Sequence, residues 1–219
     1  DVGNAVKSAG GKMVGGVFYP FDTQDFSSFL LTVSASKAKV IALSGGSDAT
    51  IIKQAIEFGL TRGGQQFAGT VQPISNIRAM GLDVAQGMYL STAFYWDLND
   101  ATRAFAKGLS ARNKGTYPSM PQAAIYSSVL HYAKAVEKAK TDNGTKVIAA
   151  MKQVPIDDEF FGKTRVREDG RALLPLSLMQ VKSPKESTGP YDFYKKITVT
   201  PGDKAYQPMA DAGCPLVKQ

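Results

Sequence analysis

The sequence has few of the side chains that metal sites and disulfide-stabilised folds require. Among 219 residues there is one cysteine, Cys214, and one histidine, His131. A single cysteine excludes a disulfide framework within the chain. A lone histidine, with no second histidine or cysteine at metal spacing, argues against a zinc site, and we expect His131 to be partly exposed on a helix. No metal or cofactor is therefore predicted.

The common catalytic motifs are also missing. The chain contains no G-x-S-x-G, no phosphate-binding Walker A sequence and no dinucleotide-binding G-x-G-x-x-G. Cys214 has no neighbour that would activate its thiol. The sequence therefore predicts a protein that is not an enzyme. An enzymatic alternative would need catalytic residues outside these 219.

Long apolar runs and concentrated charge are absent as well. No stretch approaches 18 uncharged apolar residues, the length expected of a membrane-spanning helix. The formal net charge is +7, with seven basic and six acidic side chains in residues 1–96 and nineteen and thirteen in residues 97–219. The densest basic stretch, residues 163–171, is interrupted by Glu168 and Asp169 and has no interleaved aromatics. Nucleic acid is therefore not a predicted partner.

The sequence does contain an alternation of short apolar strands and amphipathic helices. Strands are expected at residues 12–19, 40–43 and 67–70, and helices are expected to start at caps within 23–25 and 47–48. Continuous apolar strands alternating with helices are typical of an α/β fold with a parallel, helix-covered sheet.

The pattern changes after residue 87. A strand is expected over residues 88–96, followed by a helix capped within 97–100, a long helix and a short helix over 145–153. The long helix is expected to bury Ile125, Val129, Ala133 and Val136. A hairpin within 160–182, turned at Asp169-Gly170, and a strand at 195–200 complete the predicted elements.

Several short segments, in a fixed order, carry a resemblance to a known family. They are Thr23-x-Asp25-Phe26-Ser27, Lys37-Ala38-Lys39-Val40-Ile41, Gly45-Gly46, Gln54-Ala55-x-x-x-Gly59-Leu60, Ala85-Gln86-Gly87-Met88, Pro121-Gln122-Ala123 with Tyr126, and Phe161-Gly162-x-x-Arg165 before Glu168-Asp169-Gly170-Arg171. Their order and spacing resemble the type I periplasmic solute-binding proteins of ABC transporters, the branched-chain amino acid or leucine-binding family. The likeness runs to about residue 182.

The resemblance implies two Rossmann-like lobes, of which the chain spans only part. Residues 1–90 and 182–219 match the second, C-terminal lobe, and residues 98–176 match the returning, incomplete part of the first. Residues 88–97 and 176–181 match the hinge crossings. We therefore expect these residues to be what remains of a longer protein. We also expect an apolar surface on residues 98–176, where a second chain could associate.

Ligands of this family bind between the lobes at the carboxyl ends of strands. Ser44, Gly46 and Ser47 follow a strand, so the resemblance makes them candidate ligand contacts, although a tight turn with an N-cap is the alternative. In amino-acid-binding members the next such loop carries an acidic residue that pairs with the ligand ammonium. The matching position here is Val71, with no carboxylate within three residues. Because an unpaired buried ammonium is costly, the predicted ligand is a small hydrophobic or aromatic carboxylate.

Four further residues would suit such a pocket, namely Gln72, Tyr95, Met120 and Gln122. The alternative for Tyr95 is hinge-strand packing, and for Met120 and Gln122 it is a loop and helix start. The resemblance also implies a periplasmic location and an ABC permease of the inner membrane as partner. The alternative functions are a branched-chain amino acid binding protein and a ligand-sensing receptor domain of the same fold.

Overall fold

A computed structural model describes residues 2–45, 48–215 and 217. The chain divides into two compact units, each made of two separate stretches of sequence. Unit 1 comprises residues 1–91 and 179–195, and unit 2 comprises residues 92–178 and 196–219. Residues 196–219 thus group with unit 2, whereas the sequence predicted all of 182–219 with residues 1–90. The assignment of these stretches to lobes stays a prediction.

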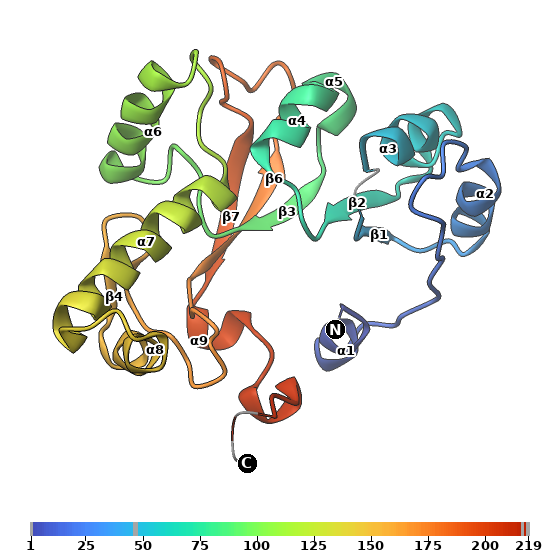
Figure 1. The fold of residues 1–219 in the computed structure, drawn as a ribbon. Coiled ribbons are helices and arrows are strands. Elements are labelled where there is room, and N and C mark those ends of the chain that lie inside the picture. Colours follow the sequence, from blue (N-terminus) through green and yellow to red (C-terminus); the bar gives the residue numbers. More distant parts are fainter. Residues whose placement is uncertain (1, 46–47, 216, 218–219) are drawn as a thin grey trace. The chain divides into compact units, whose positions relative to one another are not determined.

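A parallel sheet organises the first half of the chain (Figure 1). Strands β1 (Val40–Leu43), β2 (Gln66–Gly69) and β3 (Tyr89–Thr92) pair in parallel. With β6 (Leu176–Val181) and β7 (Tyr194–Thr200) they form a sheet in the order β1-β2-β3-β6-β7. The parallel strands are joined through α3 (Asp48–Glu57), a 3-10 turn at Thr61–Gly63, α4 (Ile74–Met80) and α5 (Leu82–Ala85). The predicted α/β class is confirmed.

Apolar side chains from these helices and strands form the core of unit 1. Phe26, which precedes α2 (Ser27–Ala35), is 1% exposed, Ile52 of α3 is 2% exposed and Ile77 of α4 is 0% exposed. The N-cap of α2 is Phe26, one residue after the predicted cap within 23–25, and the Asp25 carboxylate accepts the Ser27 N–H at 2.9 Å.

The strand expected at residues 12–19 is wrong. Residues 11–20 form no strand, and the neighbouring helix α1 (Val2–Ser8) buries none of its residues. Phe18 is 95% exposed and Phe21 is 89% exposed. The physical reason is that the sheet ends at β1, so this apolar segment has no neighbouring strand to pair with.

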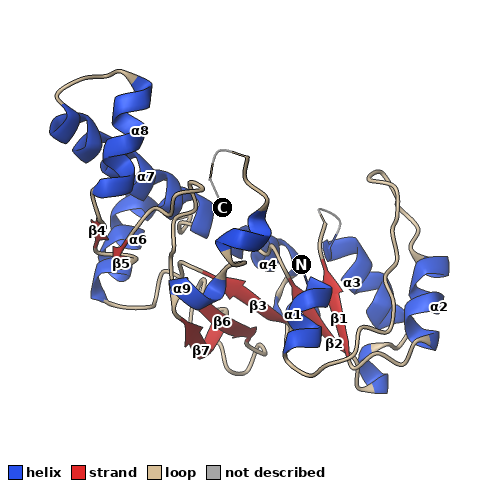
Figure 2. Ribbon diagram, turned by 90° about the horizontal axis from the view of Figure 1, so that it is seen from below, coloured by secondary structure: helices blue, strands red, loops and turns tan. Residues whose placement is uncertain are grey.

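Unit 2 is built around α6 (Asp100–Arg112), α7 (Met120–Ala139) and α8 (Gly144–Gln153), with a small hairpin of β4 (Ile156–Asp158) and β5 (Gly162–Thr164) (Figure 2). Helices α7 and α8 pack through Ala135, Val147 and Ala150. An aromatic cluster joins α6 to α7, with the Phe105 ring 5.2 Å from Tyr126 and 4.4 Å from Phe160. The chain ends with α9 (Gly202–Ala205) and a 3-10 turn at Met209–Ala212.

Helix α7 confirms the predicted long helix but not its buried face. Ile125 is 64% exposed and Val129 is 61% exposed, and Ala133 is also exposed, whereas Val136 is partly buried against the contact with α8. The opposite face, formed by Ala123, Ser127, His131 and Ala135, is buried. Small side chains on that face allow α8 and β4 to approach closely, which the spacing of the larger apolar residues did not indicate.

Two polar side chains hold this buried face of α7 in place. The Ser127 hydroxyl donates to the Asp158 carboxylate, and a ring nitrogen of His131 lies 2.9 Å from the Met151 carbonyl oxygen. His131 is 4% exposed, so the expected partly exposed histidine is wrong.

The predicted strand over residues 88–96 stops at Thr92. Its hydroxyl donates to the Phe94 carbonyl at 2.8 Å, which bends the chain out of the strand direction. The predicted turn at Asp169-Gly170 is confirmed: Gly170 has φ 84°, and the Arg167 N–H donates to the Arg171 carbonyl at 2.8 Å. A single bridge between Val166 and Ala172 flanks this turn in place of two long strands.

Candidate functional site

Two loops leave the parallel sheet at the same edge. Leu43, the last residue of β1, lies opposite Gly69, the last residue of β2, so the following loops start side by side. Both the backbone N–H and the hydroxyl of Thr70 donate to the Leu43 carbonyl at 3.0 Å. Ser44 is exposed at this edge. Gly46 and Ser47 lie outside the described residues, and α3 begins directly after them.

Val71 and Gln72 occupy the second of these loops. Val71 is 62% exposed, whereas Gln72 is 6% exposed and packs on Gly69, where a Cβ would overlap its side chain. Gly69 is therefore required for the path of this loop, a role that the sequence pattern did not indicate. Ser44, Val71 and Gln72 thus lie at one sheet edge within unit 1 and present an apolar side chain and an amide, but no carboxylate.

Tyr95 and Met120 belong to unit 2, where both are packed. Tyr95 is 5% exposed and its ring lies 5.8 Å from Trp96, which in turn lies 5.0 Å from Tyr117. The Met120 sulfur accepts the Ala93 N–H at 3.4 Å and packs against a cluster that includes Phe94 and Phe161. Tyr95 is thus packed, as its alternative stated, and Met120 is the first residue of α7, as its alternative stated. A ligand role for either residue stays a prediction.

Gln122 caps the start of α7. Its Oε1 accepts the Ser119 N–H at 2.7 Å and the Ser119 hydroxyl at 2.6 Å. The two residues form a capping box, which the sequence spacing Ser-x-x-Gln indicates. Gln122 therefore has the helix-start role that was its alternative. Among the described candidates, Ser44, Val71 and Gln72 belong to unit 1, and Tyr95, Met120 and Gln122 belong to unit 2.

Charged side chains in unit 1 form a local network near the end of β6. Lys182 Nζ lies 2.5 Å from the Asp192 carboxylate, and the Thr188 N–H donates to it at 2.9 Å. Burial raises the pKa of Asp192, but Lys182 and Thr188 outweigh that effect and hold the pKa below its ordinary value. Nearby, the Arg78 guanidinium lies 4.9 Å above the Tyr191 ring centre. These contacts fix the loop between β6 and β7.

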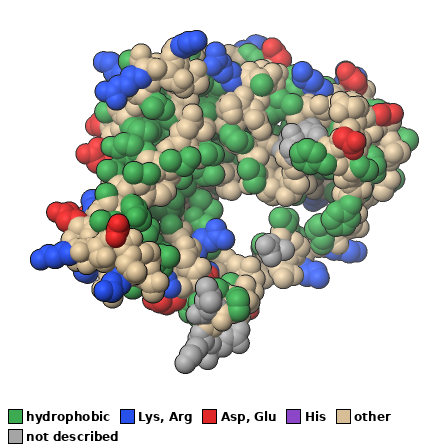
Figure 3. Space-filling model, viewed as in Figure 1, with side chains coloured by type: hydrophobic (Ala, Val, Ile, Leu, Met, Phe, Trp, Pro, Cys, Tyr) green, Lys and Arg blue, Asp and Glu red, His purple; other side chains and the backbone are tan. Residues whose placement is uncertain are grey.

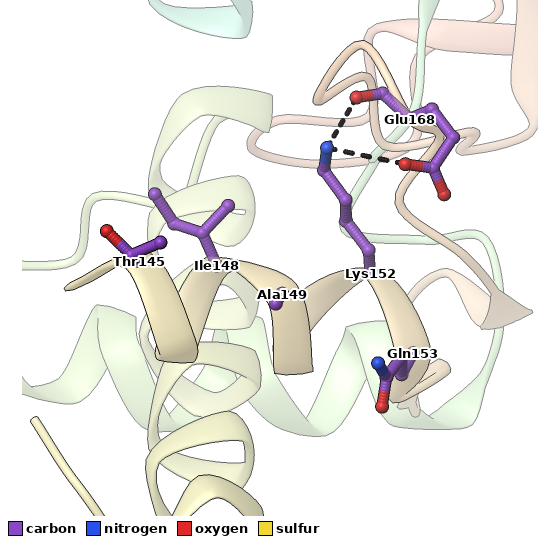
Figure 4. Close-up of a pocket in the computed structure, with 6 residues that line it drawn as sticks. All are labelled: Thr145, Ile148, Ala149, Lys152, Gln153 and Glu168. Carbon is purple, nitrogen blue, oxygen red and sulfur yellow. Dashed lines mark hydrogen bonds and ion pairs between the residues drawn. The ribbon is translucent and has the colours of Figure 1, made fainter. Parts of the chain in front are cut away.

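A surface hollow on α8 is a second place where a ligand could be sought (Figure 4). It has a volume of about 390 Å³ and is lined by Thr145, Ile148, Ala149, Lys152, Gln153 and Glu168. The Lys152 amine already donates to the Glu168 carbonyl at 2.6 Å and lies 3.5 Å from its carboxylate. No sequence pattern predicted this hollow, and the Lys152 amine that lines it already has Glu168 as its partner.

Neither metal ligands nor membrane helices stand out in this fold. Across residues 2–45 and 48–215, no group of three or more histidine, cysteine, aspartate or glutamate side chains is placed to hold a metal ion. Within the same part of the chain, every helix is too short or too polar to cross a bilayer.

Comparison with known proteins decides the family. A family model described as "Periplasmic binding protein" matches residues 1–189. The chain belongs to the type I periplasmic binding proteins of ABC transporters. The resemblance identified from the sequence segments is therefore confirmed. This family consists of solute-binding transport proteins and is not a class of enzymes.

Solved structures of other family members agree over nearly the whole chain. A periplasmic binding protein from Burkholderia mallei is 39% identical, with a TM-score of 0.90, over 98% of this chain and 57% of its own. A branched-chain amino acid ABC transporter periplasmic ligand-binding protein from Burkholderia xenovorans is 37% identical, with a TM-score of 0.85, over 96% of this chain and 56% of its own.

A more distant neighbour shows the same fold. The Rhodopseudomonas palustris solute-binding protein in complex with 3,4-dihydroxybenzoic acid is 20% identical, with a TM-score of 0.74, over 90% of this chain and 54% of its own. No curated protein sequence matches the chain. The chain thus spans just over half the length of these structural relatives.

Proposed function

We propose that the chain is part of a periplasmic solute-binding protein that captures a small hydrophobic or aromatic carboxylate between two lobes. The protein would then deliver this ligand to an ABC permease of the inner membrane. Family membership supports the solute-binding role and a periplasmic or extracellular location. We choose this class of ligand because no carboxylate lies within three residues of Val71 in the sequence.

The chemistry at Val71 disfavours a zwitterionic amino acid. Val71 is 62% exposed at the carboxyl end of β2, in the position where the resemblance expects an acidic partner for the ligand ammonium. Transfer of an ammonium from water into a closed site without a counter-charge costs several kcal/mol. A ligand without an amine avoids this cost. The R. palustris protein, solved with 3,4-dihydroxybenzoic acid, supports this ligand class for the fold.

A carboxylate has suitable donors at the same sheet edge. The loop after β1 leads directly into α3, whose first backbone N–H groups and positive dipole end favour an anion. Ser44 lies in this loop, and Gln72 provides an amide in the neighbouring one. We assign the carboxylate of the ligand to this edge. We assign its apolar part to the aromatic and apolar residues of the hinge and first lobe, including Tyr95 and Met120.

Hinge motion would close the two lobes on the ligand. We assign the hinge to residues 88–97 and 176–181. Where these stretches meet in unit 1, the Gly87 N–H donates to the Val181 carbonyl at 2.9 Å and the Val181 N–H donates to the Met88 carbonyl at 2.9 Å. Paired crossings of this kind can bend at a few residues while each lobe stays rigid.

The exposed face of α7 is the surface that we propose for association. Large apolar side chains cover it, and Figure 3 shows hydrophobic side chains gathered over α6 and α7. These exposed residues are Ile125, Tyr126, Val129, Leu130 and Tyr132. An apolar patch of this kind marks an interaction surface. The occupant we propose is the remainder of the first lobe, since the relatives have nearly twice the length of polypeptide.

A branched-chain amino acid is the second candidate ligand. The B. xenovorans relative, at 37% identity, is a branched-chain amino acid ABC transporter protein, and its identity to the chain exceeds that of the R. palustris neighbour. This candidate requires an acidic partner for the ammonium from another part of the protein.

A thermal-shift panel distinguishes the two candidates. The protein is heated with 3,4-dihydroxybenzoate, benzoate, octanoate, leucine, isoleucine or valine, and unfolding is followed by Trp96 fluorescence. A ligand at 100 times its Kd stabilises by about 2.7 kcal/mol, which raises Tm by roughly 5–10 °C for a chain of this size. We expect that rise with a carboxylate that lacks an amine. A rise with the amino acids alone would refute the argument from Val71, and no rise with any compound would refute ligand capture by this chain.

A further inference from the structure

The loop after β1 contains a glycine that lies against a side chain from an earlier part of the chain. Gly45 follows Ser44 at the carboxyl end of β1, and its φ lies outside the left-handed region that favours glycine. A Cβ at this position would nonetheless overlap the hydroxyl oxygen of Tyr19, and the Tyr19 Cζ would lie 3.5 Å away. Among the residues described, both atoms that this Cβ would meet within 4 Å thus belong to Tyr19.

Two phenylalanines hold the Tyr19 ring in place. The ring centre of Tyr19 lies 5.1 Å from that of Phe26, in an edge-to-face arrangement, and 6.2 Å from that of Phe29. Phe26 is 1% exposed in the core of unit 1, and the rings of Phe26 and Phe29 are themselves 6.4 Å apart. Aromatic pairs at these separations attract each other. Withdrawal of the Tyr19 ring to make room for a Cβ at position 45 would therefore disrupt two such contacts.

Gln54 of α3 fixes the segment that carries these rings. Its Oε1 accepts the Phe26 N–H at 2.8 Å, and its Nε2 donates to the Gln24 carbonyl at 2.8 Å. Figures 1 and 2 show α2 beside α3 in this part of unit 1. The loop of Gly45 leads into α3 as well. Tyr19 and this loop are therefore held to the same helix, from two different directions along the chain.

We propose that Tyr19 is a positioning residue, which sets the path of the loop after β1 and so restricts position 45 to glycine. The inference rests on the proposed function, which assigns the carboxylate of the ligand to this edge of the sheet. The donors of that edge are Ser44 and the first backbone N–H groups of α3, and both border the backbone of Gly45. A side chain at position 45 would push this loop away from Tyr19 and move the donors with it.

A double-mutant cycle between Tyr19 and Gly45 tests the contact without any ligand. Gly45→Ala should lower Tm by roughly 2–6 °C, because an added methyl group that overlaps a packed neighbour destabilises the fold. In a Tyr19→Phe background the same substitution should lower Tm by less than about 1 °C, since phenylalanine lacks the overlapping oxygen and keeps Cζ at an ordinary contact distance. Equal losses in the two backgrounds would refute the contact.

Gly63→Ala is the matched control for this cycle. Gly63 is an exposed glycine of the 3-10 turn in the same unit, its φ also lies outside the left-handed region, and a Cβ there would meet no described atom within 4 Å. We expect Gly63→Ala to change Tm by the same amount, within about 1 °C, in both backgrounds. A dependence on Tyr19 as large as that of Gly45→Ala would mean that Tyr19→Phe acts on general stability, and it would overturn the proposal.

The amide signal of Thr70 reports the position of the loop, again without a ligand. Its N–H donates to the carbonyl of Leu43, two residues before Gly45, at 3.0 Å. In two-dimensional NMR spectra, Gly45→Ala should shift the Thr70 signal by changing this hydrogen bond. The same substitution in the Tyr19→Phe background should leave the Thr70 signal where Tyr19→Phe alone places it. A shift of equal size in both backgrounds, or no shift in either, would contradict the positioning role of Tyr19.

Calorimetric titration with 3,4-dihydroxybenzoate connects the loop to the ligand. Gly45→Ala should weaken binding at least roughly tenfold in the unaltered protein and less than about threefold in the Tyr19→Phe background, a difference that a loss of overall stability would not produce. Unchanged affinity in Gly45→Ala would overturn the role of Tyr19 at the site, even where Tm falls. No binding by the unaltered protein would instead refute the proposed ligand, and the Thr70 signal would still decide whether Tyr19 positions the loop.

Discussion

Replacing Ile125 and Val129 by lysine tests how α7 is oriented in unit 2. Their side chains are 64% and 61% exposed. Full burial of such a side chain stabilises by about 1.5–3 kcal/mol, so the third that is buried contributes roughly 0.5–1 kcal/mol each. The aliphatic stem of a lysine covers part of the same surface, and lysine has a higher helix propensity than isoleucine or valine. We therefore expect the double variant to change the free energy of unfolding by less than about 1 kcal/mol.

The control variant changes the buried contact between α7 and α8, where Val147 is 0% exposed. Val147→Ala should lower the free energy of unfolding by about 2 kcal/mol, because it removes buried methyl groups and leaves a cavity. Urea unfolding followed by the fluorescence of Trp96, which packs on Tyr117 within unit 2, measures both variants. A loss above about 3 kcal/mol in the double lysine variant would refute the outward orientation, because two lysines would then be entering the core.

Three further substitutions probe local contacts. Asn99→Ala removes the side-chain oxygen that accepts a backbone N–H at 2.9 Å at the start of α6, and should lower the free energy of unfolding by about 1 kcal/mol, while Asn99→Ser retains most of it. Thr92→Val deletes the hydroxyl that donates to the Phe94 carbonyl and should cost about 1–2 kcal/mol in urea unfolding, and no loss would show that this bend needs no hydrogen bond. Arg167 holds the pKa of Asp169 at about 2, below its ordinary value. The ionised Asp169 therefore stabilises the fold above pH 4, and this stabilisation is lost as the pH falls toward 2. Asp169→Asn should therefore flatten the fall of Tm between pH 4 and pH 2, and an unchanged slope would contradict this.

Local patterns predicted most elements of the fold. The strand at Val40–Leu43, the helix ended by Gly59 at φ 76° and the turn at Gly170 follow from short signals of apolar runs and glycine. These features depend on neighbours in sequence. The prediction of a strand at residues 12–19 was wrong because a strand needs a neighbouring strand to pair with, and β1 is the edge strand of the described sheet.

The face of α7 was missed for a related reason. Apolar residues lie on both of its sides, and spacing alone does not say which side meets a neighbour. Packing against α8 selects the side with His131 and Ala135, because a small residue at position 135 lets the helices approach closely. Ala123, on the same side of α7, packs in the cluster with Phe94 and Phe161. The exposed face formed by Ile125 and Val129 is the apolar surface that was expected on residues 98–176.

For the candidate site, the resemblance implied ligand contacts from the loops after β1 and β2, and the parallel register of these strands places Ser44 beside the loop of Val71. The role of Gln122 as a helix cap could be foreseen from its spacing to Ser119. The need for glycine at position 69 could not, because it arises from the packing of Gln72 against it.

The central claim is that Val71 makes this protein select a carboxylate without an amine. Calorimetric titration of the unaltered protein and of Val71→Glu with 3,4-dihydroxybenzoate and with leucine tests it most directly, with Val71→Gln as a neutral control of similar size. Since Val71 is 62% exposed, neither substitution should disturb folding. We predict that the unaltered protein and Val71→Gln bind the aromatic carboxylate in preference to leucine, and that Val71→Glu reverses this preference. Tight leucine binding by the unaltered protein, unaffected by Val71→Glu, would contradict the account.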